Sequence, residues 1–190
     1  MMKEKTISFN HLGVLSIDTP IAKLFAVLIG SLVIATLAQI SIQVPFSPVP
    51  ITGQTIGVIL VGGILGAKRG AFAVMTYLVE GAIGLSVFAD FKAGTQVLVG
   101  PTAGYLWAFI PAAYLTGYAT EKGFTIKPVT CFLTCFTFTT LILVSGTAFL
   151  ILFNFGFKEA LIMGFYPFLV GDVVKSAVCA VLFTGIRKAV

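Results

Sequence analysis

Long apolar runs, separated by short polar or glycine- and proline-rich segments, dominate the pattern of this chain. About 20 apolar residues are enough to cross a bilayer as a helix. The first run, 21–42, contains a single charged residue, Lys23, near its start. Five further runs follow, one ending near residue 66 and the others at 71–85, 101–119, 129–153 and 165–186. The pattern predicts six transmembrane helices.

The connecting segments differ in character. Residues 44–50 contain three prolines, which disfavour helix and favour extended backbone. Residues 86–99 are polar and rich in glycine, and they form a long connection for a compact domain. Lys68, Arg69 and Gly70 are expected to form a tight charged turn. Both long connections are candidates for binding elements or lids.

The composition agrees with a protein embedded in lipid. Apolar residues make up 58% of the 190 residues and charged residues 10%, with a mean hydropathy of +1.07. Soluble domains are about 45–50% apolar and about 25% charged. We therefore expect one all-α integral membrane domain over residues 1–190, with an N-terminal segment at 1–20 and the helix bundle at 21–188.

The basic residues indicate the orientation in the membrane. The net charge is +5, but the basic residues are dispersed, so the sequence does not indicate binding to nucleic acid. If the chain crosses the membrane six times, both termini lie on the same side. Nine basic residues then lie on that side, and two, Lys92 and Lys158, lie on the opposite side. The nine are Lys3, Lys5, Lys23, Lys68, Arg69, Lys122, Lys127, Arg187 and Lys188. The positive-inside rule then predicts a multi-pass protein of the cell membrane with both termini in the cytoplasm.

Two charged residues interrupt the last apolar run. Asp172 and Lys175 are three positions apart, so they share one face of the predicted helix. A charge at the centre of a spanning helix costs about 2.5–3.5 kcal/mol on insertion scales. The two residues either neutralise each other or form part of a polar ligand site. The ligand site is the favoured interpretation, since apolar residues would have been less costly.

Small residues recur along the first run, where Ala26, Gly30 and Ala35 would let another helix approach closely. That neighbour is either another helix of the bundle or a second membrane protein. Cys131 and Cys135 lie one turn apart without a histidine or third cysteine nearby in the sequence, so we predict packing residues and no metal site.

Motifs of common enzyme classes are missing. The sequence contains no phosphate-binding glycine loop, no zinc-protease motif and no serine-hydrolase motif. No chain of acidic residues suggests an ion relay. We therefore expect a binding subunit that is not an enzyme and that depends on partner proteins for energy.

Five short segments, in order along the chain, resemble the signatures of the BioY family. They are PVPITGQT at 48–55, LGAKRG at 65–70, GAIGLSVFA at 81–89, GPTAGYL at 100–106 and GDVVK at 171–175. BioY is the biotin-specific substrate-binding component, or S-component, of energy-coupling factor (ECF) transporters. The resemblance covers about residues 21–186.

The resemblance implies a six-helix S-component bundle whose biotin site lies near the extracellular face, under the loop between the first two helices. Biotin would be the transported ligand, with no cofactor. The partners would be a transmembrane coupling protein, which docks on Ala26, Gly30 and Ala35, and ATPase subunits that hydrolyse ATP in the cytoplasm.

The chemistry of biotin assigns roles to the two charged residues of the last helix. Asp172 is expected to accept a hydrogen bond from a ureido N–H, and Lys175 to donate to the ureido oxygen. The tail carboxylate would lie nearer the mouth, within reach of Lys92.

The motif match adds further contacts. Gln54, Asp90 and Tyr105 are expected as polar contacts, while Phe88 and Trp107 would pack on the bicyclic ring. Two alternatives remain open from the sequence. One is a membrane enzyme acting on a lipid or prenyl substrate, with Asp172 as acid or base. The other is an S-component for a different vitamin.

Overall fold

The computed structural model describes residues 8–9, 15–16, 19–153 and 155–189. Most of the predicted N-terminal segment, with Lys3 and Lys5, lies outside the described residues. The helices are α1 (Pro20–Ala38), α2 (Gln54–Leu65), α3 (Ala67–Ala82), η1 (Ala89–Phe91), α4 (Thr95–Val99), α5 (Ala103–Glu121), α6 (Pro128–Leu152), α7 (Phe157–Gly164) and α8 (Tyr166–Ala189). The strands are β1 (Ser8–Phe9), β2 (Leu15–Ser16), β3 (Ser41–Ile42) and β4 (Ile51–Thr52), paired as the antiparallel ribbons β1–β2 and β3–β4.

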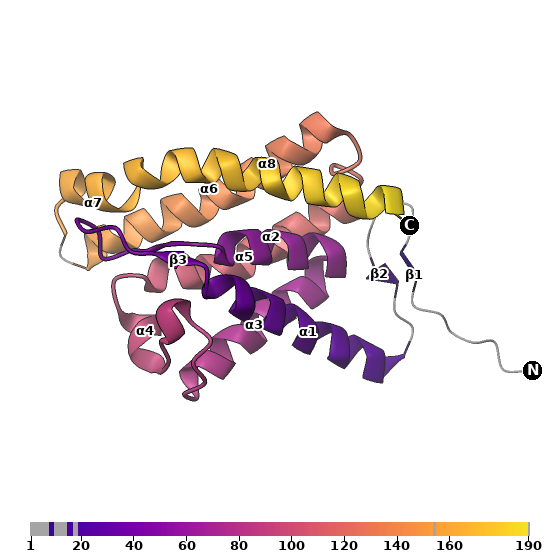
Figure 1. Cartoon of the computed structure of the whole chain (residues 1–190), viewed down its shortest axis with the longest axis horizontal. Helices are drawn as coiled ribbons and strands as arrows, with labels where there is room; N and C mark the ends of the chain where they lie inside the picture. Colours follow the sequence, from indigo (N-terminus) through magenta and orange to yellow (C-terminus); the bar gives the residue numbers. More distant parts are fainter. Residues whose placement is uncertain (1–7, 10–14, 17–18, 154, 190) are drawn as a thin grey trace, which may run out of the picture.

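The six long helices run back and forth along one direction of the molecule, with α5 packed against α2, α3 and α6 (Figure 1). The start of α1 and the end of α8 lie at the same end of the bundle. The β3–β4 ribbon, α4 and α7 lie at the opposite end (Figure 1). Twelve of the 19 residues of α5 are buried, so this helix forms the centre of the core.

The prediction of a mostly helical fold is confirmed, and several ends have clear causes. The Thr19 hydroxyl caps α1 by accepting from the Ala22 N–H at 3.3 Å, and Pro20 follows at the first helical position, where its missing N–H does no harm. Between α2 and α3 the chain reverses at Gly66 alone, whose φ of 83° favours glycine.

Two connections of the bundle differ from simple turns, and the turn predicted at Lys68, Arg69 and Gly70 is wrong. Lys68 and Arg69 do not form a turn but belong to the first turn of α3, because Gly66 makes the reversal without them. Lys158 and Glu159 lie inside α7, an additional short helix. The Glu159 carboxylate accepts the Gly156 N–H at 3.2 Å, which stabilises the start of α7.

Glycines allow α2, α3 and α5 to approach at backbone distance. A Cβ added to Gly62 on α2 would lie 2.5 Å from the backbone oxygen of Ala113 on α5. One added to Gly70 on α3 would lie 2.6 Å from the Cα of Gly62. The short second and third helices thus obtain, through close contact with α5, the neighbours that short apolar helices need in a membrane.

Three stretches of the described residues are long and apolar enough to cross a membrane: Pro20–Ala38, Pro128–Leu152 and Phe157–Arg187. The shorter α2 is apolar as well. Large apolar side chains also cover the outside of the bundle, among them Ile21, Leu152 and Val170, each at least 70% exposed. An outer surface of this kind suits lipid rather than water.

Candidate functional site

A cavity opens at the end of the bundle that carries the β3–β4 ribbon, and its walls come from six parts of the chain. These are residues 49–55, residues 88–92, Val97 of α4 and the facing sides of α5, α6 and α8. Its empty space is about 790 Å³ when the open mouth is included. One water molecule occupies about 30 Å³ of liquid. The cavity is therefore large enough for a small organic molecule.

Asp172 and Lys175, the two charged residues that interrupt the last apolar run, both lie on the cavity wall. Asp172 is 6% exposed and Lys175 is half-buried. The two do not form an ion pair, because no carboxylate oxygen of Asp172 lies within 4.0 Å of the ammonium. The Lys175 ammonium has no hydrogen bond to any part of the chain that the structure describes. The two side chains are therefore not joined by a direct contact, and both residues line the space where a ligand would lie.

Gln54 also lines the cavity, at the start of α2, but its amide is already engaged. Its amide nitrogen donates to the Tyr77 hydroxyl at 2.5 Å, and its amide oxygen accepts from the Thr52 hydroxyl at 3.1 Å. All three side chains are held by this chain of bonds. One amide N–H of Gln54 is left for a ligand.

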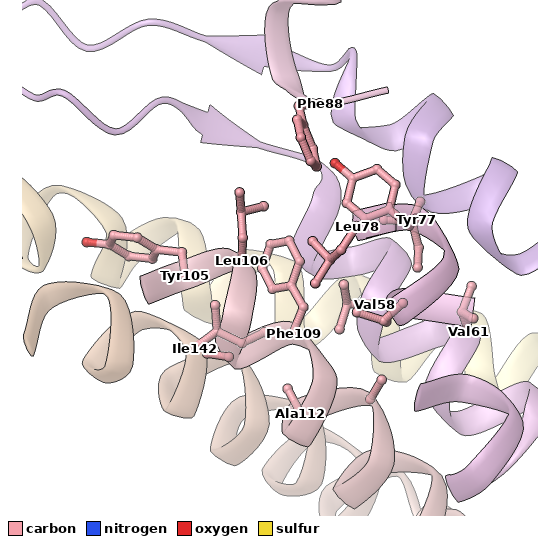
Figure 2. Packing of buried hydrophobic residues seen from close by; sticks show 14 of the residues in the cluster. Val58, Val61, Tyr77, Leu78, Phe88, Tyr105, Leu106, Phe109, Ala112 and Ile142 are labelled. Carbon is pink, nitrogen blue, oxygen red and sulfur yellow. The ribbon is translucent and has the colours of Figure 1, made fainter. Parts of the chain in front are cut away.

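Two aromatic rings form apolar parts of the wall. Phe88 is 1% exposed and stands edge-on to Tyr77, with ring centroids 5.5 Å apart. Figure 2 shows Phe88 reaching from its loop onto the helices, next to Tyr77 and Leu78. In the same view Tyr105 points away from Phe88 and Tyr77, and its hydroxyl donates to the Gly164 backbone oxygen at 2.8 Å. Tyr105 therefore offers its ring to the cavity, whereas the sequence predicted a polar contact.

The loop that carries Phe88 is fixed from α1. The Gln39 amide nitrogen donates to the backbone oxygens of Val87 and Phe88, at 3.3 and 3.2 Å, and its amide oxygen accepts the Phe91 N–H at 3.1 Å. Asp90 and Phe91 have φ values of 58° and 55°, which non-glycine residues rarely adopt. Such strained backbone persists only where its surroundings hold it, and it is frequent at functional sites.

Two site residues lie elsewhere than the sequence predicted. Asp90 does not line the cavity; its carboxylate accepts a hydrogen bond from Gln43 and lies 3.5 Å from the Lys92 ammonium. Lys92 does line the cavity, and its side chain is 57% exposed. Trp107 is 51% exposed on the outside of α5, where its indole N–H donates to the Leu98 backbone oxygen at 3.0 Å. The prediction that Trp107 packs on the ligand is wrong, because Leu106 and Phe109 occupy the cavity face of α5.

Sequence reasoning missed several hydroxyl groups at the cavity. Thr55 lines it with a buried hydroxyl that has no hydrogen-bond partner. Thr140 donates to the Asp172 carboxylate at 2.7 Å, and Thr139, on the wall, lies 3.0 Å from Ser176. Thr55 is the last residue of the quoted segment 48–55, and the other hydroxyl residues lie inside apolar runs. Neither position gave a signal that separates these residues from packing threonines.

The small residues of α1 pack inside the chain. Ala26 is 9% and Ala35 7% exposed, and Gly30 is buried. A Cβ on Gly30 would lie 3.0 Å from side-chain atoms of Ala73 and Val61. The structure therefore places this stripe against α2 and α3. A bulky substitution at Gly30 would therefore disrupt the bundle itself.

No three His, Cys, Asp or Glu side chains come close enough to hold a metal ion in the described part of the chain. Cys131, Cys135 and Cys179 are buried in one apolar cluster with Ile59 and Phe183. This surrounding matches the packing role that the sequence predicted for Cys131 and Cys135.

The fold and cavity define a class: a helical membrane protein with one partly enclosed site for a small polar molecule at one end of its bundle. The sequence profile of the BioY family matches residues 4–190. The chain belongs to the BioY family.

Individual relatives agree with this assignment. A biotin transporter BioY of Thermotoga maritima is 38% identical over 158 residues, which cover 77% of this chain and 86% of the relative. A biotin transporter BioY of Rhizobium etli is 36% identical over 173 residues, covering 87% and 90%. The crystal structure of an S-component for biotin from an ECF-type ABC transporter superposes with a TM-score of 0.81 and 25% identity, covering 90% of this chain and 95% of that one.

Proposed function

We propose that this chain is the biotin-binding S-component of an ECF-type transporter, and that it captures biotin for import without catalysing a reaction. The observation that carries the proposal is that Asp172 and Lys175 both line the cavity without forming an ion pair with each other. The chain that contains them belongs to the BioY family. The relatives reported above are named as transporters or transporter components, which leaves the membrane-enzyme alternative without support.

The proposed ligand contacts follow from the chemistry of the cavity. Biotin offers two ureido N–H donors, one ureido oxygen and a tail carboxylate. The Asp172 carboxylate accepts a ureido N–H, and the Lys175 ammonium donates to the ureido oxygen. The Thr55 hydroxyl supplies a further polar contact, because a buried hydroxyl without a partner is unfavourable until a ligand meets it.

The apolar walls and the mouth complete the proposed site. The Phe88 ring packs on the bicyclic ring of biotin, and Tyr105 extends this apolar surface. Lys92, at the mouth, attracts the tail carboxylate, although its ion pair with Asp90 weakens that attraction. The loop at 43–50 covers the site from the outside.

The membrane arrangement is part of the same proposal. The six helices α1, α2, α3, α5, α6 and α8 cross the cell membrane in alternating directions, with both termini in the cytoplasm. The start of α3, with Lys68 and Arg69, and the connection between α5 and α6, with Lys122 and Lys127, then face the cytoplasm, as the positive-inside rule requires. The cavity opens toward the outside, where biotin is captured.

The energy for import comes from partners in this proposal. A transmembrane coupling protein and cytoplasmic ATPase subunits bind the S-component, and ATP is hydrolysed on those subunits. The docking surface on the coupling protein does not include the inner stripe of Ala26, Gly30 and Ala35, since these residues are buried within the chain.

Equilibrium binding tests the proposal directly. Labelled biotin is titrated against the detergent-purified chain, without ATP and without partner proteins. We expect nanomolar binding, recovery of chemically unchanged biotin, and no competition from other vitamins. Tight binding of another vitamin in preference to biotin would contradict the substrate assignment, and a converted product would contradict the transporter class.

A further inference from the structure

The carboxylate of Asp172 is held by a neighbouring helix. The Thr140 hydroxyl on α6 donates to one carboxylate oxygen, Oδ2, at 2.7 Å. The other oxygen, Oδ1, accepts no hydrogen bond from the described residues. Because Asp172 lines the cavity, this division leaves one oxygen of the carboxylate for a ligand.

Thr140 is unusual among the helical threonines of this chain. Most of them turn their hydroxyl back to the backbone oxygen four residues earlier, a common arrangement in apolar helices. This group consists of Thr36, Thr76, Thr116, Thr120, Thr134, Thr137, Thr147 and Thr184. The Thr140 hydroxyl instead reaches across to α8, because a carboxylate is a stronger acceptor than a backbone oxygen that already serves its own helix.

A second hydroxyl pair fixes the backbone beside the carboxylate. The Ser176 hydroxyl donates to the backbone oxygen of Asp172 at 2.7 Å, and the Thr139 hydroxyl lies 3.0 Å from Ser176. Adjacent residues of α6 thus hold this turn of α8, through Ser176 at its backbone and through Thr140 at its side chain. With the backbone fixed, rotation of the Asp172 side chain is the freedom that Thr140 removes.

We propose that Thr140 is a positioning residue for ligand binding, which orients the Asp172 carboxylate so that Oδ1 meets an N–H donor of the ligand. The inference rests on the proposed function, since it needs a ligand that donates to Asp172. Pre-orientation increases affinity because the carboxylate does not have to be ordered when the ligand binds.

The test compares two substitutions that differ in one hydroxyl. Thr140→Val keeps the shape and removes the donor, whereas Thr140→Ser keeps the donor. We expect the dissociation constant for biotin to rise about tenfold in Thr140→Val, the size of one lost charge-assisted hydrogen bond, and to stay within about twofold in Thr140→Ser. Thr137→Val is the matched control, because its hydroxyl is exposed on the same helix and bonds only to the Leu133 backbone oxygen.

A double-mutant cycle separates positioning from general damage. In an Asp172→Ala background the Thr140 hydroxyl has no carboxylate to orient, so Thr140→Val should change affinity less than about twofold there. An equal loss in both backgrounds would overturn the inference, as would wild-type affinity in Thr140→Val. If the valine variant does not fold, Thr140→Ala replaces it in the same cycle.

The outcome for the unaltered chain keeps the two proposals apart. Absence of biotin binding by the unaltered chain overturns the proposed function and this inference together. Biotin binding that is equally tight in the unaltered chain and in Thr140→Val overturns the inference alone.

Discussion

The Ser47 hydroxyl donates a hydrogen bond of 2.7 Å to the backbone oxygen of Met163, which joins the loop between α1 and α2 to the end of α7. The same hydroxyl accepts the Val49 N–H at 3.1 Å, and Val49 is a buried residue of the cavity wall. One side chain therefore links the covering loop, the cavity wall and α7. On the other side, Gln43 bonds to Asp90 and fixes the loop to the segment that carries Phe88.

We expect Ser47→Ala to release biotin faster. Loss of one hydrogen bond of about 1 kcal/mol should increase the dissociation rate about fivefold, since the loop opens more easily. The rate is measured by chasing bound labelled biotin with an excess of unlabelled biotin. Ser86→Ala, at an exposed residue of the neighbouring loop with no hydrogen bond from its side chain in the described structure, is the control. An unchanged rate in Ser47→Ala would show that this contact does not hold the loop.

Asp172→Asn should weaken biotin binding at least tenfold, which corresponds to about 1.4 kcal/mol. The substitution keeps the shape of the side chain and removes the charge that a ureido N–H would meet. Titration of labelled biotin provides the measurement, with thermal unfolding to confirm that the variant is folded. Masking the biotin tail as an amide should reduce affinity less than this substitution does, if Asp172 holds the ureido end. A larger loss from the amide would reverse the assignment of ends.

Thr55→Val should separate stability from affinity. In the ligand-free protein the Thr55 hydroxyl is buried without a partner, so removing it should leave the melting temperature unchanged or raise it. With biotin bound the hydroxyl gains a partner, and its loss should weaken binding about threefold to tenfold. Thr55→Ser, which keeps the hydroxyl, should bind like the unaltered chain. A lower melting temperature with unchanged affinity would indicate a structural role alone.

Gly62→Ala should destabilise the bundle. The added methyl group would lie 2.5 Å from the Ala113 backbone oxygen, so α2 must move away from α5. Overpacking of this kind costs about 1–3 kcal/mol, seen as a lower melting temperature in detergent. Gly171→Ala is the matched control, because no atom lies within 4 Å of the added group, and it should be neutral or stabilising by up to about 1 kcal/mol. Equal melting temperatures in both variants would contradict the close contact.

The orientation in the membrane predicts which surfaces react in whole cells. A cysteine introduced at Phe46, which is 56% exposed, should react with an impermeant maleimide, whereas one introduced at Lys122 should not. The three native cysteines are buried, so the unaltered chain should remain unlabelled. Labelling at position 122 without labelling at position 46 would place the termini outside.

The sequence predicted helices well where the signal was a continuous apolar run, as in α1 and α6. It predicted the start of α3 poorly, because Lys68 and Arg69 suggested a turn while a single glycine at position 66 was enough to make it. Charged residues are only correlated with turns. The reversal itself depends on a glycine with a positive φ, and the sequence does not reveal which glycine adopts that conformation.

For the candidate site, the sequence singled out some of the residues that line the cavity and misplaced or missed others. Asp172 and Lys175 stood out because charge inside an apolar run is costly, and both line the cavity. Trp107 was assigned to the wrong face, because α5 is apolar on all sides and its composition does not reveal which side faces the cavity. Thr55 and Thr140 were missed because a hydroxyl inside a membrane helix usually satisfies itself on its own backbone. Their partners, or the absence of one, depend on tertiary packing.

Three hydrogen bonds of the Gln39 side chain go to residues 87–91, and they have a mechanical consequence. Gln39 is the capping residue at the end of α1. Its side chain therefore connects the helix by hydrogen bonds to the strained segment that carries Phe88. A tilt or rotation of α1 would therefore move the segment that carries Phe88 at the cavity wall. The outward-facing side of α1 carries Phe25, Ile29 and Leu32, each about 60% exposed. A partner that displaced α1 by contacting that outer surface would therefore also displace the segment beside the ligand.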